Sequence, residues 1–87
     1  MERTVKISNK SGIHVRPAAQ IAELANKFQA NITFVKDGNE INAKSIMDLL
    51  TLAAGEGTQI KIKAEGIDEK KAIDALESLV NSKFSED

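Results

Sequence analysis

The sequence predicts an α+β fold, an open-faced β-sandwich with the element order β-α-β-β-α-β-α. Two observations carry this prediction. Four short segments alternate between apolar and polar residues, and three segments repeat apolar residues at helical spacing. Each strand then has one apolar face and each helix one apolar stripe. Both are buried when all three helices cover one face of a four-stranded, mainly antiparallel sheet. The order of the strands is left open.

The first strand and the first helix flank the only histidine of the chain. Val5 and Ile7 alternate with polar residues, which is typical of a strand with one buried face. Pro17 suits the first turn of a helix, where a missing backbone N–H costs nothing. The apolar stripe of this helix is expected to comprise Ala18, Ile21, Ala22, Ala25 and Phe28.

The second and third strands are predicted to form a hairpin. Ile32 and Phe34 alternate with polar residues and are followed by Asp37-Gly38. This dipeptide favours a tight hairpin turn, because both central turn positions need positive φ. Residues 40–43 supply the returning strand.

A short second helix follows the hairpin. Ser45-Ile46-Met47-Asp48 matches a capping box, in which Ser45 caps the helix and the Asp48 carboxylate reaches back. Gly55 is expected to end the helix in the left-handed conformation. Met47 lies off the buried stripe and is expected to be exposed. That stripe comprises Ile46, Leu49, Leu50 and Ala53.

A fourth strand and a last helix complete the fold. Ile60, Ile62 and Ala64 alternate with lysines, which predicts a strand with a charged open face. Asp68 is expected to cap the last helix. Its buried stripe is expected to comprise Ala72, Ile73, Leu76, Leu79 and Val80.

Length and composition limit the classes of function. The 87 residues are expected to form one domain, residues 1–87, and the absence of cysteine suits a reducing compartment. A net charge of −1, with neither Trp nor Tyr, argues against nucleic acid as a partner. No apolar run reaches the length of a membrane span, so direct membrane insertion is not expected. We expect a cytoplasmic monomer without metal or cofactor.

His14 is the candidate functional residue. If it caps the first helix, the amides of Val15 and Arg16 have no acceptor within the helix and form an anion site at its positive end. Arg16 adds a planar charged group suited to phosphate oxygens. The imidazole can accept a phosphoryl group through a neutral nitrogen. No phosphate-binding loop of the ATP-dependent kind accompanies it, which indicates a carrier rather than an enzyme. The spacing alone also permits a surface histidine with no chemical role.

The segment Gly12-Ile13-His14-Val15-Arg16-Pro17-Ala18 resembles the active-site signature of the HPr family, the histidine-containing phosphocarriers of the bacterial phosphotransferase system. Lys44-Ser45-Ile46-Met47 resembles the regulatory-serine region of the same family. The resemblance extends over essentially the whole chain. It implies that Enzyme I phosphorylates His14 on Nδ1, that Arg16 stabilises the phosphate, and that the group passes to Enzyme IIA domains of sugar transport systems.

The resemblance also implies a docking surface and a regulatory site. The surface lies around Ile46, Met47 and Leu50. Independently of the resemblance, the charge of Lys27 makes it a candidate contact for an acidic partner surface. Ser45 resembles the serine that an HPr kinase/phosphorylase modifies, which would also imply a carbohydrate-response transcription factor as a partner. Asp48 stands where the family often has glycine, and its carboxylate would repel a phosphate on Ser45.

Two further readings belong to other classes of function. One is an HPr-like regulatory module, of a catabolite-control or nitrogen-related branch, that binds partners without carrying a phosphoryl group to sugar transport. Retention of His14 favours the carrier over this reading. The other is a domain with no site, which leaves the coincidence of two motifs unexplained.

Overall fold

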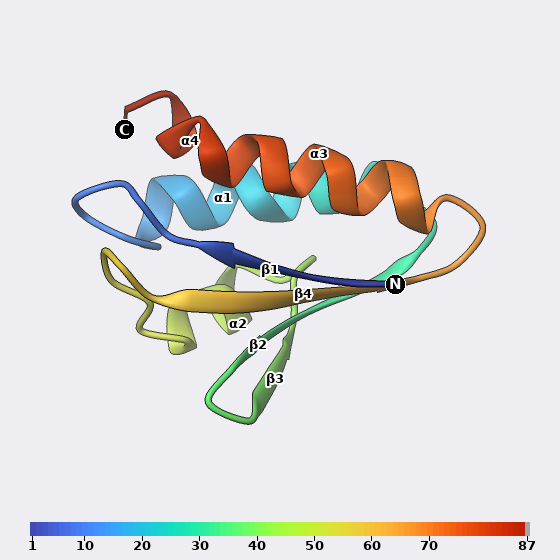
Figure 1. Cartoon of the computed structure of the whole chain (residues 1–87), viewed down its shortest axis with the longest axis horizontal. Coiled ribbons are helices and arrows are strands. Elements are labelled where there is room, and N and C mark those ends of the chain that lie inside the picture. The colour runs from blue at the N-terminus through green and yellow to red at the C-terminus, as the bar shows by residue number, and fades with distance from the viewer. Residues whose placement is uncertain (87) are drawn as a thin grey trace.

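The computed structural model describes residues 1–86 of the chain (Figure 1). The expected domain 1–87 ends at Asp87, which lies outside the described residues. The element order confirms the seven expected elements and adds a short turn, α4, after them. The bounds are β1 (Glu2–Lys6), α1 (Val15–Ala25), β2 (Asn31–Lys36), β3 (Asn39–Asn42), α2 (Ile46–Thr51), β4 (Gln59–Glu65), α3 (Glu69–Asn81) and α4 (Lys83–Glu86).

The four strands form one antiparallel sheet in the order β1-β4-β2-β3. The helices pack on one face of it, so the expected open-faced sandwich is confirmed (Figure 1). In the register, Val5 lies beside Ile60 and Phe34 beside Ile62. These side chains point into the core between sheet and helices, because alternate residues of a strand face opposite sides.

The β2–β3 hairpin turns as its sequence predicts. Asp37 and Gly38 have φ values of 50° and 83°, the two positive values that a tight hairpin turn requires. The turn sets the register, in which Lys36 lies beside Asn39. This places Lys36 at the end of a short, well-defined ribbon.

The first helix ends earlier than its apolar stripe indicates. Asn26 is its C-cap, so Phe28 lies beyond the helix and packs against the core only partly buried. The Asn26 amide group donates to the carbonyls of Ala22, at 2.8 Å, and Lys44, at 3.0 Å. The end of α1 is thereby tied to the segment that precedes α2.

Two details of the second helix differ from expectation. Ser45 does cap α2, accepting a hydrogen bond from the Asp48 amide at 3.2 Å. The Asp48 carboxylate, however, accepts from the Asn42 amide at 3.4 Å, because the Ser45 amide already donates to the Asn42 carbonyl. The left-handed residue after the helix is Ala53, with a φ of 53°, and not Gly55. The helix ends at Thr51, which puts position 53 at the point where the chain reverses.

Asp68 precedes α3 as expected but its carboxylate does not cap that helix. It accepts instead from the amides of Gln29 and Ala30, both at 2.9 Å, which join α1 to β2. The hydrogen bond from the Gln29 amide holds the pKa of Asp68 below its usual value, assisted by that from Ala30. One carboxylate therefore joins two connections far apart in the sequence.

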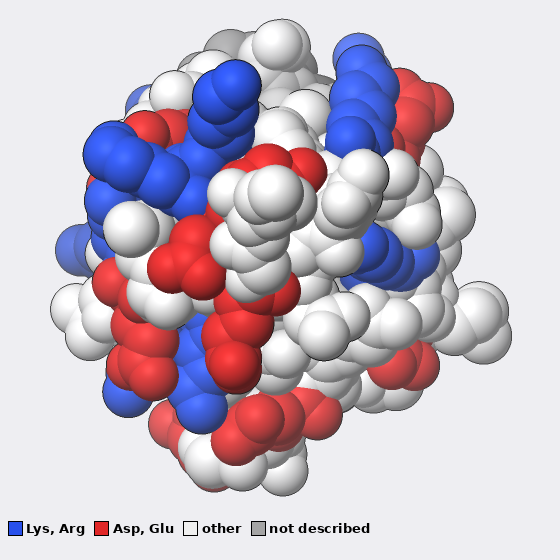
Figure 2. Space-filling model, turned by 90° about the vertical axis from the view of Figure 1, so that its right-hand side faces the viewer, with Lys and Arg blue, Asp and Glu red and all other residues white. Residues whose placement is uncertain are grey.

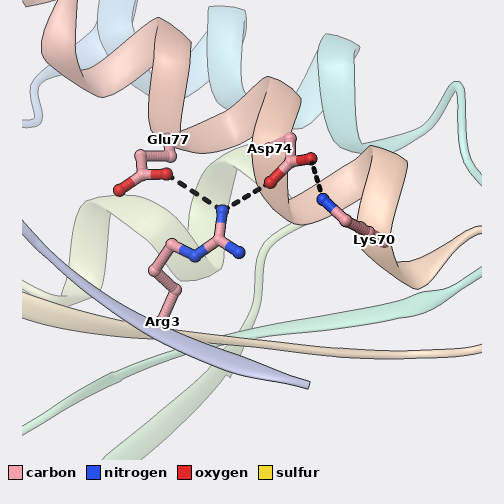
Figure 3. Close-up of polar contacts among 4 residues, drawn as sticks. All are labelled: Arg3, Lys70, Asp74 and Glu77. Atoms are coloured by element: carbon pink, nitrogen blue, oxygen red, sulfur yellow. Dashed lines mark hydrogen bonds and ion pairs between the residues drawn. The ribbon is translucent and has the colours of Figure 1, made fainter.

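Ion pairs fasten the edge strand β1 to α3 (Figure 3). Arg3 contacts the carboxylates of Asp74 and Glu77, the latter at 3.0 Å, while Lys70 contacts Asp74 at 2.9 Å. Figure 2 shows the end of the molecule where β4 meets α3. Acidic and basic side chains are interleaved on this face.

The chain closes its core with a left-handed turn. Lys83, Phe84 and Ser85 all have φ values between 54° and 56°, which is unfavourable for residues with a Cβ atom. Phe84 is fully buried in the core cluster, and its burial offsets this cost. Within residues 1–86, no helix has the length and apolarity needed to cross a membrane.

Candidate functional site

The segment before His14, residues 12 and 13, packs against the chain that follows α2. The Ile13 amide donates to the Ala54 carbonyl at 2.8 Å. Gly12 has a φ of 68°, and a Cβ atom there would lie 2.2 Å from the Ala54 oxygen. Only glycine satisfies both the backbone conformation and the close approach. The position of His14 is therefore fixed by contacts some forty residues away in sequence.

A second set of hydrogen bonds closes this segment on itself. The Asn9 side chain, 1% exposed, donates to the Gly12 carbonyl at 2.8 Å, while the Gly12 amide donates to the Asn9 carbonyl at 3.2 Å. The chain thus enters α1 through a compact turn with little freedom.

His14 is the N-cap of α1, as expected. Its backbone is extended, and its carbonyl accepts the first helical hydrogen bond from the Ala18 amide at 2.8 Å. Its side chain makes no capping bond to the helix and is half-buried. The imidazole therefore lies at the start of α1 without serving as its cap.

The start of α1 has the features of an anion site. Val15 and Arg16 are the first two helical residues, so their amides have no carbonyl four residues earlier within the helix to donate to. Pro17, the third, is buried and offers no amide. The first turn contains no acidic side chain, so no carboxylate of this turn occupies the positive end of the helix. Arg16 is exposed and carries a permanent positive charge beside it.

Several apolar side chains of α1 and α2 are exposed or half-buried. Met47 is 74% exposed, Ile46 41% and Val15 66%, while Leu50 is half-buried. α1 packs against α2, the helix that carries Ile46, Met47 and Leu50. We call Val15, Ile46, Met47 and Leu50 the apolar patch. The exposure of Met47 is as expected, but Ile46 and Ala53, which were expected in the buried stripe of α2, are exposed because the helix ends at Thr51 and turns only Leu49 fully inward. Val15 was not expected in this role.

Other predicted residues lie farther from His14. Lys27 is exposed but follows the end of α1, an eleven-residue helix about 16 Å long. Ser45 begins α2 near that same end, through the Asn26–Lys44 hydrogen bond. His14 and Ser45 therefore stand at opposite ends of the α1–α2 pair. Among residues 1–86, no three His, Asp or Glu side chains gather as metal ligands.

Sequence reasoning missed the residues that hold the site. Gly12 belongs to the recognised motif, but its contact with Ala54 is invisible in a single sequence. Asn9 gave a weak signal, since an Asn-Lys-Ser-Gly run is typical of a turn. Ala54 gave none.

Comparison with known proteins identifies the family. Residues 1–82 match the family model described as the "PTS HPr component phosphorylation site". The chain belongs to the HPr family. HPr of Treponema pallidum is 42% identical over 85 residues, covering 98% of this chain and 97% of that protein. The crystal structure of HPr from Thermoanaerobacter tengcongensis superimposes with a TM-score of 0.96 at 46% identity, covering 100% of this chain and 98% of that one.

The family also contains HPr-like proteins with other names. The HPr-like protein Crh of Halalkalibacterium halodurans is 45% identical over 76 residues, covering 87% of this chain and 90% of that protein. The chain is thus similar both to HPr proteins and to a protein described as HPr-like.

Proposed function

We propose that this HPr-family chain is a phosphocarrier in which His14 accepts a phosphoryl group from phosphorylated Enzyme I and passes it to Enzyme IIA domains of sugar transport systems. The observation that carries the proposal is the place of His14 at the N-cap of α1, beside the amides of Val15 and Arg16. The family description, which names a phosphorylation site, supports it.

The chemistry requires a nucleophile and a place for charge. The Nδ1 lone pair attacks phosphorus, and a nitrogen–phosphorus bond forms as the bond to the donor atom of Enzyme I breaks. The dianionic phosphoryl group then lies against the Val15 and Arg16 amides and the positive end of α1. The Arg16 guanidinium donates charge-assisted hydrogen bonds to its oxygens. The group leaves for Enzyme IIA by the same steps in reverse, so the chain is a stoichiometric carrier and not an enzyme.

The apolar patch supplies the docking surface for both partners. A flexible, exposed Met47 adapts to more than one partner surface. Because Enzyme I and Enzyme IIA would cover the same patch, the carrier meets them one after the other. Lys27 adds a positive charge at the far end of α1, where it steers acidic partners. The chain acts as a monomer in the cytoplasm.

The decisive experiment uses Enzyme I and phosphoenolpyruvate with the wild-type chain and His14→Ala. We expect an acid-labile phosphoryl adduct on the wild type and none on the variant. Arg16→Ala should retain the fold and slow transfer by at least about tenfold, because it removes a charge-assisted contact. Lys10→Ala, an exposed residue of the turn before His14, is the matched control. Absence of the adduct on the wild type overturns the proposal, and an unchanged rate for Arg16→Ala overturns the role of Arg16.

The similarity to Crh favours one alternative, an HPr-like regulatory module of a catabolite-control or nitrogen-related branch. Such a module would bind partners through the apolar patch without relaying the phosphoryl group. Transfer from the phosphorylated chain to an Enzyme IIA separates the two functions. Binding with no relay would support the module.

We further propose that Ser45 is a site of regulatory phosphorylation by an HPr kinase/phosphorylase, with a carbohydrate-response transcription factor as reader. Ser45 is half-exposed and adjoins the apolar patch, where a dianion would weaken docking. The Asp48 carboxylate opposes this modification by repulsion. Incubation with ATP and the kinase should modify the wild type slowly and Asp48→Ala faster. No modification of either chain would contradict the regulatory role.

A further inference from the structure

The chain just after α2 holds the segment that leads into His14. We call Ala53 and Ala54 the mount, and residues 9–13 the His14 loop. The Ala54 carbonyl accepts a hydrogen bond from the Ile13 amide and lies close to Gly12. Ala54 is only 3% exposed. A shift of Ala54 therefore moves the chain that leads into His14. The position of Gly12 and Ile13, which lead into His14, thus depends on where the chain leaves α2.

This mount has a conformation that the local chain does not favour. Ala53 is exposed and left-handed, with a φ of 53°. A residue with a Cβ atom adopts this conformation at a cost in free energy, so the turn persists only where neighbouring contacts hold it.

Lys36 supplies such contacts. Its ammonium group donates to the carbonyls of Leu52, at 3.0 Å, and Ala53, at 3.3 Å. These carbonyls end α2, where no amide of the helix is available to pair with them. The side chain is half-buried and projects from the end of the β2–β3 hairpin, a defined ribbon. A positive charge there also complements the negative end of the helix.

We propose that Lys36 is a positioning residue for phosphoryl transfer at His14. Its ammonium group holds the carbonyls of Leu52 and Ala53. The next residue, Ala54, in turn holds Gly12 and Ile13. The inference rests on the proposed function. Lys36 would not touch the phosphoryl group. It would fix the mount and so hold the imidazole at the separation and angle that in-line transfer requires.

The test compares Lys36→Gln with Lys61→Gln, a matched change of an exposed lysine on the open face of the sheet. Each chain is assayed as a substrate of Enzyme I, and exchange of the Ile13 amide is followed by NMR. Lys36→Gln should lower kcat about tenfold with little change in KM, since a small displacement of reacting groups costs rate rather than docking. It should also speed exchange of the Ile13 amide. Lys36→Arg, which keeps the charge and its donors, should restore most of the rate.

Two results would overturn the proposal. One is a Lys36→Gln chain that matches Lys61→Gln in both rate and exchange. The other is a slower rate with unchanged exchange at Ile13, which would place Lys36 in direct contact with Enzyme I. Lys36→Met, which keeps the aliphatic stem, repeats the test if Lys36→Gln loses its fold. Failure of the wild type to accept a phosphoryl group refutes the proposed function instead, and amide exchange still reports on the mount.

Discussion

Single residues in unusual backbone conformations decide where His14 lies. Gly12 lets two segments approach within the space that a Cβ atom would fill, and Ala53 turns the chain so that Ala54 can receive them. The motif around His14 predicts its chemistry, since a histidine at the N-cap position, two amides and an arginine are local features. The contact that fixes the motif in space is not local, and no pattern in one sequence encodes it.

Gly12→Ala should therefore be much more damaging than another change of a left-handed glycine. The added methyl group would meet the Ala54 oxygen at 2.2 Å, so the mount must shift. We expect a loss of about 2–3 kcal/mol in the free energy of unfolding, together with slower phosphorylation of His14. Urea unfolding and the Enzyme I assay measure the two effects.

Gly57→Ala is the control for that change. Its φ is 88°, and its Cβ atom would meet nothing within 4 Å. The expected loss is about 1 kcal/mol, from backbone conformation alone. Equal losses for the two variants would show that the close approach of Gly12 to Ala54 contributes nothing.

At the scale of elements, local sequence signals predicted which helices and strands form and in what order. They did not predict every contact between those elements. Asp37-Gly38 defined its hairpin because a tight turn needs only its own residues. Asp68 was expected to cap α3, yet its carboxylate binds the connection between α1 and β2. Nothing near Asp68 in the sequence identifies that partner, since the contact exists only once α1 and α3 lie side by side.

Asp68→Asn should reveal this connection through its dependence on pH. The folded pKa of Asp68 lies below its usual value, chiefly through the hydrogen bond from the Gln29 amide. A carboxyl group with a depressed folded pKa stabilises the fold above its unfolded pKa and loses that contribution as pH falls through the folded one. The difference in unfolding free energy between wild type and variant should be largest near pH 6 and shrink below about pH 4.

Chemical denaturation from pH 6 to pH 2 measures that difference. Asp37→Asn, in the exposed hairpin turn, is the control, and Asn tolerates the same left-handed conformation. A difference for Asp68→Asn that stays constant across the range would contradict the assigned hydrogen bonds.

At the scale of the whole molecule, the fold class and the single core followed from periodicity, but the closing turn did not. Lys83-Phe84-Ser85 contains neither glycine nor a repeating apolar pattern, so its left-handed path had no sequence signal. The path exists because it places Phe84 in the core beneath the end of α3. Tertiary burial overrides local preference here.

Phe84→Ala should accordingly cost about 3–5 kcal/mol, the range for removing a fully buried aromatic ring. Thermal unfolding should show a midpoint lower by more than about 12 °C for a chain of this size. Ser85→Ala, an exposed neighbour in the same turn, should leave the midpoint nearly unchanged. A small effect of Phe84→Ala would mean that the core is complete without the turn.

The pairing of β1 with β4 joins the strand before His14 to a strand that is synthesised much later. During synthesis His14 leaves the ribosome early, but its loop has no mount until Ala54 emerges. The strand before it has no partner until residues 59–63 follow. Such distant contacts form slowly, because a long loop must close before they contribute. A nascent chain stalled before β4 would thus contain the phosphorylation motif without the contacts that hold it in place, and transfer would begin only after residues 59–63 have emerged.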